Sequence, residues 1–503
     1  MSTTLKLRGG STAEHSTFTG EAREVTVDTQ KNTVVVHDGS TVGGHPLLKV
    51  SDIGTASTAN IGTDTGEAIG TDEAKEYFDL NFEPSVKPTI SSDFSRNDHK
   101  LYEQYGLEPK TITQMYDVVR ASTATYVDAT GKIRTAGVDQ PRIDYSSGQG
   151  RLLVEEQRTN LLRWSEDFSN AVWNKTNLTV ESSSQVSPNT EKTMYKLIES
   201  ATNAAHLITA PLDNLLNKTK TLFVKAGERR RVILGTTGSA RSSGWALFDL
   251  LDGQVINKAS EVEDATIVPI SDGIFRVSVS VNINNVGTFA VYIMPDNATS
   301  DADRAYTGDG TSGIYIWGAQ LEQAPTPSSY IPTEASAVTR AADNVSRVLG
   351  DEFNKEQWTL YFEHSTVQTN SNLNYVIFIA NSATSSGTDW LGINKGMGDN
   401  YSVRTRTASV GSATTVPNSA VNLTLGEKHK IALTYDRGFL SFFVNGETIF
   451  SAYGLPNRDL EGALGYLKLA GASNLATFRC EYSDIDVYPK ALSDQECIQL
   501  TKV

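Results

Sequence analysis

The sequence predicts a mainly β protein built from several domains. The chain has 503 residues, which is more than one hydrophobic core usually organises, and typical domain sizes predict about three domains. Apolar residues make up 39 % and charged residues 20 % of the chain, a composition typical of folded rather than disordered proteins. Short β-branched segments with alternating apolar residues, separated by Gly, Asn, Asp and Ser, recur along most of its length, and this pattern favours antiparallel strands.

Charge and hydropathy exclude two classes of partner. The formal net charge is −15 and basic residues form no stripe apart from Arg229, Arg230 and Arg231, so we expect no nucleic-acid binding. No run reaches the roughly 18 apolar residues that a membrane span needs, and the N-terminus lacks the apolar core of a signal peptide. We therefore expect no membrane insertion and synthesis in a cytoplasm. Cys480 and Cys497 are expected to be buried thiols rather than a bridge.

The first half of the chain is expected to hold three small segments. Residues 1–50 contain two β-branched runs, 24–28 and 33–37, next to Asp-Gly and Gly-Gly pairs, which predicts a small β module with a hairpin. Residues 51–95 are rich in Gly, Ser, Thr, Asp and Ala without periodicity, which indicates a linker or stalk and no coiled coil. Any trimer must therefore come from the β domains. We expect residues 96–162 to form an adaptor of short strands.

The adaptor carries a concentration of charged side chains. An interpretation as a catalytic pocket and one as a salt-bridged joint between domains both fit the composition, and we favour the joint. The residues concerned are Arg120, Arg134, Arg142, Arg151, Arg158, Glu155 and Glu156.

Two antiparallel β-sandwiches are expected to follow, at residues 163–344 and 345–503. In the first, alternating apolar segments such as 275–279 are separated by polar, Gly-rich loops, as in two packed sheets. In the second, Ser493 followed three residues later by Glu496 predicts a helix with a capping box near the end of the chain.

No constellation for catalysis stands out. Glycan-cleaving enzymes use a pair of carboxylates, and Asp484 and Asp486 lie two apart on an expected strand, but we favour a structural role for them. The seven histidines show no metal-ligand spacing, and no Gly-x-Ser-x-Gly, phosphate-binding or dinucleotide-binding motif is present. We expect no enzyme activity, no metal site and no cofactor, although structural calcium between loop carboxylates remains open.

Three aromatic residues are candidates for sugar binding. Rings that stack on a pyranose must be exposed beside polar partners, and Trp245, Trp390 and Tyr401 lie near polar, Gly/Ser-rich stretches. Packing in the core is the alternative for each, and we favour it because tryptophan is largely buried on average.

The N-terminal fifty residues contain three recognisable segments. They are Leu7-Arg-Gly-Gly-Ser-Thr-Ala-Glu-His15, Glu24-Val-Thr-Val-Asp28 and Val34-Val-Val-His-Asp-Gly-Ser40. Together they resemble the N-terminal module of phage tail-fibre proteins of the major tropism determinant type. The resemblance implies attachment of a fibre to the virion through other tail proteins, usually as a homotrimer.

The C-terminal half resembles two kinds of binding module. Phrases at 164–173, 317–322 and 329–333 are similar to phage-borne carbohydrate-binding jelly rolls. Segments at 440–446 and 484–493 resemble the concanavalin-like or laminin-G-like lectin fold. Together these resemblances imply a non-catalytic tail fibre in the virion tail, made in the host cytoplasm, that binds a host surface polysaccharide. A tail-spike glycan depolymerase and a purely structural tail adaptor or decoration protein are the alternatives.

Overall fold

The computed structural model divides into two compact units, residues 1–83 and 84–503. The structure describes residues 8–19, 21, 25–30, 33–37, 40–42, 44–46, 84–103, 106–211, 218–237, 243–282, 287–366, 374–381, 390–395, 401–406, 414–415, 426–455, 465–469 and 479–503. The expected linker at 51–95 lies mostly outside the described residues. Among those described, no helix is long and apolar enough to cross a membrane.

The first unit contains a four-stranded sheet in the order β1-β2-β3-β4. Strands β2 and β3 pair antiparallel with Val27 opposite Val34, which confirms the expected hairpin, and β1 joins β2 in parallel. A short helix, α1, begins after Ser11, which caps it together with Glu14. The bounds are β1 Arg8–Gly10, α1 Thr12–His15, β2 Val25–Asp28, β3 Thr33–Val36 and β4 His45–Pro46.

Two buried histidines meet on one hydroxyl inside this unit. The Oγ1 atom of Thr26 lies 2.8 Å from Nε2 of His15 and 2.9 Å from Nε2 of His37. Gly44 has φ +62°, and a Cβ atom there would lie 2.6 Å from Nδ1 of His37. This position therefore requires glycine for two reasons, its left-handed backbone and the close approach of the imidazole.

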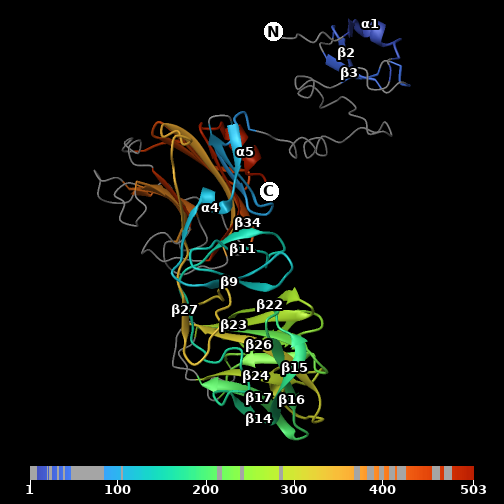
Figure 1. The fold of residues 1–503 in the computed structure, drawn as a ribbon, viewed down its shortest axis with the longest axis vertical. Helices are drawn as coiled ribbons and strands as arrows, with labels where there is room; N and C mark the ends of the chain where they lie inside the picture. Colours follow the sequence, from blue (N-terminus) through green and yellow to red (C-terminus); the bar gives the residue numbers. More distant parts are fainter. Residues whose placement is uncertain are drawn as a thin grey trace. The chain divides into compact units, whose positions relative to one another are not determined.

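The second unit contains two β-sandwiches. We call the first the inserted sandwich; its two antiparallel sheets face each other (Figure 1) and enclose a core that includes Trp173, Phe248 and Phe289. One sheet comprises β14 Asn174–Thr176, β17 Asn203–Pro211, β24 Thr288–Met294, β19 Arg231–Gly235, β20 Ala246–Asp249, β21 Gln254–Lys258 and β25 Ala305–Thr307. The other comprises β15 Leu178–Val186, β16 Thr193–Glu199, β26 Gly313–Glu322, β18 Lys218–Ala226, β23 Ile274–Val281 and β22 Val262–Ser271, and a short 3-10 helix, η3, spans Asp301–Arg304.

The other sandwich, which we call the outer sandwich, draws strands from two distant parts of the chain. Its larger sheet comprises β36 Glu447–Gly454, β35 Phe439–Val444, β34 Lys428–Asp436, β29 Gln357–Thr366, β38 Cys480–Tyr488, β5 Ile90–Asp93, β6 Asp98–Glu103, β7 Gly106–Lys110, β11 Ile143–Asp144 and β12 Arg151–Val154. Its smaller sheet comprises β33 Thr414–Thr415, β32 Tyr401–Arg406, β31 Trp390–Lys395, β30 Asn374–Ala380, β37 Tyr466–Leu469, β28 Asn344–Val348 and β8 Asp117–Val119. The helices are α4 Ile112–Met115 and α5 Asp494–Leu500.

The expected adaptor, residues 96–162, thus contributes strands to the outer sandwich. Strand β38 pairs with β12 through one part of its length and with β5 through the next. Ile90 and Leu152 consequently lie in the same core as Trp358 and Phe442. Helix α5 has the capping box that the sequence predicts, with Ser493 and Glu496 bonded reciprocally, and Cys480 and Cys497 are both buried and free.

The inserted sandwich enters and leaves the outer sandwich at one place. Strand β13, Arg158–Asn160, pairs antiparallel with β27, Val338–Arg340. A separate hairpin, β9 Ala124–Val127 with β10 Ile133–Ala136, lies beside this junction, since Thr125 donates a hydrogen bond to the carbonyl of Tyr330 at 2.6 Å.

A buried ionic network holds the junction together, and we call it the joint network. Asp343 accepts from Arg120 Nη1 at 2.8 Å and from Arg142 Nη2. Arg142 also donates to Glu155 at 2.8 Å, and Arg340 lies 3.5 Å from Glu155. All five side chains are at most 2 % exposed. The ion pairs of Arg120, Arg142 and Glu155 are those of a salt-bridged joint, as the sequence predicts.

Candidate functional site

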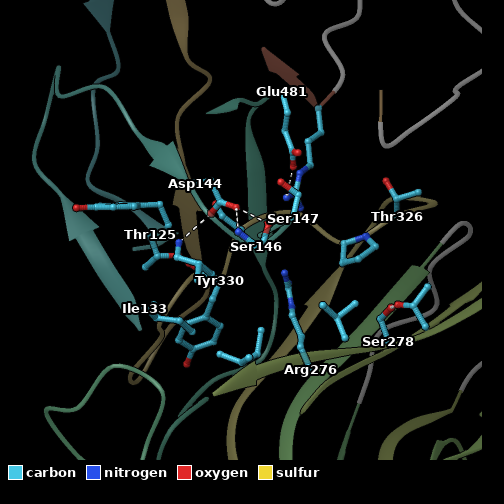
Figure 2. A pocket seen from close by; sticks show the side chains of 18 of the residues that line it. Thr125, Ile133, Asp144, Ser146, Ser147, Arg276, Ser278, Thr326, Tyr330 and Glu481 are labelled. Atoms are coloured by element: carbon cyan, nitrogen blue, oxygen red, sulfur yellow. Dashed lines mark hydrogen bonds and ion pairs between the residues drawn. The ribbon is translucent and has the colours of Figure 1, made fainter. Parts of the chain in front are cut away.

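A cavity of about 290 Å³ lies where three parts of the second unit meet (Figure 2). The β9–β10 hairpin supplies one wall, strands β22 and β23 of the inserted sandwich supply another, and side chains of the outer sandwich supply the third. Thr125, Arg276 and Glu481 are representatives of the three walls. We call this cavity the junction pocket. Its volume is close to the lower limit of about 300 Å³ for ligand pockets, which suits one sugar-sized group.

One acidic side chain of the junction pocket is held by local hydrogen bonds. Asp144 accepts from the backbone N–H of Val127 at 2.8 Å and from the backbone N–H of Ser146 at 2.9 Å. The hydroxyl of Ser146 donates to the same carboxylate. The two bonds from Ser146 form an Asx turn, and the bond from Val127 ties the carboxylate to strand β9, so Asp144 is positioned before any ligand arrives.

A second carboxylate is shared by two arginines. Glu481 accepts from Arg479 at 2.8 Å and from Arg151 at 3.4 Å. Arg151 also donates to the hydroxyl of Ser365 at 2.8 Å. The Nε atoms of Arg151 and Arg479 are buried without a hydrogen-bond partner. Arg479 also lies 4.0 Å from Glu155 of the joint network, so both arginines on this side of the junction pocket have a carboxylate partner.

Arg276 is different because no carboxylate pairs with it. Its Nη2 donates to the carbonyl of Ser328 at 2.6 Å, and its guanidinium lies 5.6 Å from the centre of the Phe223 ring. Its Nε is buried without a hydrogen bond, and no acidic oxygen of the described residues lies within the 4.0 Å of an ion pair. Burial lowers its pKa to about 10. Figure 2 shows the side chain extending from β23 toward the wall that holds Asp144 and Ser146.

A more open groove of about 640 Å³ lies on the inserted sandwich. It is lined by two partly exposed aromatic side chains, Trp164 and Tyr195. Trp164 has φ 54°, a conformation that bulky residues rarely adopt and that often accompanies function. The Tyr195 hydroxyl donates to Asp167 at 3.1 Å, and Lys192 pairs with Glu166 at 2.7 Å. Aromatic rings beside carboxylates are the surroundings that sugar hydroxyls and ring faces need.

The three aromatic residues proposed from sequence are not brought together. Trp245 is 7 % exposed in the core of the inserted sandwich. Tyr401 is 0 % exposed, and its hydroxyl bonds to His364 in the core of the outer sandwich. Trp390 is partly exposed and packs against Phe378. The burial of Trp245 and Tyr401 agrees with the core-packing alternative, whereas Trp390 alone of the three retains exposed area for a ligand.

Sequence reasoning missed Arg276 and Trp164. Arg276 lies inside an ordinary strand pattern, and nothing in its sequence neighbours marks it. The junction pocket joins residues as far apart as Thr125 and Glu481, so no local spacing announces it. For Trp164, the signal available was its position in the polar stretch that opens the inserted sandwich.

Asp484 and Asp486 lie on β38 opposite Glu363 and Tyr361 of β29, respectively. Burial, reinforced by the neighbouring charge of Asp486, raises the pKa of Asp484 to about 9. Burial likewise raises the pKa of Asp486 to about 6. In the described part of the chain, no group of three or more His, Cys, Asp or Glu side chains is arranged to hold a metal ion.

Two family models match the chain. Residues 5–41 match the major tropism determinant N-terminal domain, and residues 352–497 match the concanavalin A-like lectin/glucanases superfamily. The second match falls on strands of the outer sandwich from β29 to β38 and on α5. The chain therefore combines a tropism-determinant module with a lectin-like β-sandwich.

One curated relative is a tail fiber receptor-binding protein of Bordetella phage BPP-1. It is 50 % identical over 86 residues, which cover 16 % of this chain and 23 % of that protein. The chain thus spans about a quarter of the length of the relative that it matches. With the two family matches, this similarity supports a phage tail fibre.

Solved structures give weaker similarities. Domain 4 of the arabinanase AbnA from Geobacillus stearothermophilus, in complex with arabinotriose, is 14 % identical with a TM-score of 0.28, covering 36 % of this chain and 84 % of that domain. The CBM40 of the Ruminococcus gnavus IT-sialidase, bound to α2,3 sialyllactose, is 21 % identical with a TM-score of 0.25, covering 29 % of this chain and 83 % of that module. Scores of this size carry no conclusion about function.

Proposed function

We propose that this chain is a phage tail fibre that attaches the virion to a glycan on the host surface without cleaving it. The observation that carries the proposal is the combination, in one chain, of a tail-fibre N-terminal module at residues 5–41 and a lectin-like sandwich at residues 352–497. The first would dock to other tail proteins, and the second matches a superfamily named for lectins and glucanases. In this view the protein is a component of the virion tail.

Two hollows in the second unit support a binding role. The junction pocket offers both fixed acceptors, Asp144 and Glu481, and a guanidinium donor, Arg276. The groove offers Trp164 and Tyr195 beside carboxylates. A homotrimer would present three copies of each, and avidity would turn weak affinity per site into firm attachment.

The test uses the full chain, because β5 and β12 belong to the outer sandwich and cutting before residue 163 would remove them. Fluorescently labelled protein is incubated with intact host cells, and size exclusion with light scattering gives its oligomeric state. We expect saturable staining that soluble host polysaccharide competes away. Staining that polysaccharide cannot compete away would overturn glycan attachment in favour of another surface receptor. No staining at all would favour a structural tail adaptor.

The same mixtures distinguish binding from cleavage. A reducing-end assay on the incubated polysaccharide should show no turnover over hours. Release of new reducing ends by the wild type, lost in the Asp484→Asn variant, would instead indicate a depolymerase that uses the carboxylates of β38. Trp164→Ala and Trp390→Ala are compared in the same cell-staining assay. The variant that stains host cells less than the wild type identifies the tryptophan whose ring stacks on the sugar.

A further inference from the structure

We propose that the junction pocket binds the carboxylate of an acidic sugar, a uronic or sialic acid type of residue, through Arg276. This inference rests on the proposed function and specifies the class of glycan that the chain recognises. The ligand would place its carboxylate against Arg276 and its hydroxyl groups against Asp144 and Glu481.

Arg276 differs from the other arginines of the junction pocket in its distance from carboxylates. Arg151 and Arg479 share Glu481, and Asp144 is satisfied by Val127 and Ser146. Arg276 has no carboxylate within ion-pair distance among the described residues, and Glu322, Glu155 and Asp144 act on it only from farther away. A partly buried guanidinium without a carboxylate is unfavourable, because burial costs free energy that only a nearby negative charge offsets.

The donor groups of Arg276 differ in what they can reach. The Ser328 carbonyl takes one Nη2 hydrogen of Arg276, Phe223 covers one face of the guanidinium, and the Nε–H is buried. Nη1 makes no hydrogen bond to the described residues and is not buried, and the side chain extends into the junction pocket (Figure 2). Because a guanidinium binds a carboxylate through its N–H groups, Nη1 is the donor that an entering carboxylate would reach.

The charges of the junction pocket favour a carboxylate over a phosphate. Two carboxylates, Asp144 and Glu481, line the cavity together with three arginines, and Asp264 lies exposed at its edge. Because these charges nearly balance, a singly charged carboxylate brings less excess negative charge into the cavity than a doubly charged phosphate would. Their oxygens accept hydrogen bonds, which sugar hydroxyls donate. The surroundings of Arg276 therefore favour a monoanionic, hydroxyl-rich ligand.

The experiment compares Arg276→Gln and Arg276→Lys with Arg437→Gln in the full chain. Arg437 lies on an exposed turn with its side chain 61 % exposed, so its replacement removes the same charge away from the junction pocket. Each protein is titrated against native host surface polysaccharide, against the same polysaccharide after chemical reduction of its carboxyl groups, and against the same polysaccharide after dephosphorylation.

We expect Arg276→Gln to lose about 10- to 100-fold in affinity, as loss of hydrogen bonds to a charged group predicts. The affinity of Arg276→Lys should lie between those of the wild type and Arg276→Gln, because lysine keeps the positive charge but lacks the planar guanidinium that forms two parallel hydrogen bonds. Arg437→Gln should bind like the wild type. Carboxyl reduction should weaken wild-type binding by a similar factor, and dephosphorylation should leave it unchanged.

The outcomes keep the two proposals apart. Equal binding to native and carboxyl-reduced polysaccharide would overturn the carboxylate inference and leave glycan attachment standing. Sensitivity to dephosphorylation alone would overturn it in favour of a phosphate ligand. Absence of binding to any preparation would overturn the proposed function itself. If thermal unfolding shows that Arg276→Gln does not fold, the binding of the wild type to native and to carboxyl-reduced polysaccharide still shows whether a ligand carboxylate is recognised.

Discussion

Replacing Asp343 by asparagine should destabilise the second unit more than any comparable surface change. The carboxylate of Asp343 accepts from Arg120, from Arg142 and from the backbone N–H of Glu155. Asparagine keeps nearly the same volume but carries no charge and donates where a carboxylate accepts. Two fully buried guanidiniums would then lose their shared counter-charge while Glu155 remained as the nearest anion.

The magnitude follows from the burial of the joint network. Before the change, its buried groups are the cations Arg120, Arg142 and Arg340 and the anions Glu155 and Asp343. Removing one of two anions leaves three cations against one. Breaking a buried ion pair by removing one partner costs about 3–5 kcal/mol. Because the urea dependence of unfolding grows with size, it is about 4 kcal/mol per molar for a unit of this length, and the cost corresponds to a drop of about 1 M in the unfolding midpoint.

The assay is equilibrium unfolding in urea followed by tryptophan fluorescence. The matched control is Asp272→Asn, which removes an ion pair to Lys132 from a side chain that is 68 % exposed. Surface pairs contribute about 0–1 kcal/mol, and asparagine tolerates the left-handed backbone of that position, φ 54°. If Asp343→Asn shifted the midpoint no more than Asp272→Asn, the joint network would not stabilise the unit as argued.

Two further substitutions test other parts of the chain. The folded pKa of Asp484 is raised to about 9 from its ordinary 3.8, so the folded state binds a proton that the unfolded state releases, and stability falls as pH rises through this window. Asp484→Asn should therefore stabilise the protein by about 5 kcal/mol at pH 8 and by less than about 1 kcal/mol at pH 4. Equal effects at both pH values in urea unfolding would contradict this. Gly44→Ala should reduce hydrogen-exchange protection of β2 and β3, because the added Cβ would overlap His37. Gly148→Ala is the control, since Gly148 also has a positive φ but no atom within 4 Å of an added Cβ, and it should show only the cost of backbone strain. Similar losses of protection around both sites would argue against the overlap.

Local patterns were sufficient for much of the fold. The β-branched runs of β2 and β3 and the capping box of α5 are set by contacts within a few residues, and both are found where the sequence predicts them. Alternation of apolar residues likewise predicts the two sandwiches, because the side-chain period of a strand shows directly in the sequence.

The long-range pairings were not accessible in the same way. The pairing of β12 with β38 joins Leu152 to Tyr482, and neither strand differs in pattern from an edge strand of a separate domain. The junction pocket depends on such pairings, since it forms only after three distant segments come together. Exposure also escapes the sequence: nothing local separates Trp245, which is buried, from Trp164, which is partly exposed.

The pairing of β13 with β27 has a consequence for how such proteins change. Arg158 lies opposite Arg340 in this short antiparallel ladder, so the two ends of the inserted sandwich lie about 5 Å apart, the spacing of paired strands. Any compact domain whose own termini are adjacent would fit between these ends without moving a strand of the outer sandwich. The inserted sandwich is in this sense a replaceable module. A phage lineage could exchange it, and with it one of the three walls of the junction pocket, while keeping the rest of the chain unchanged.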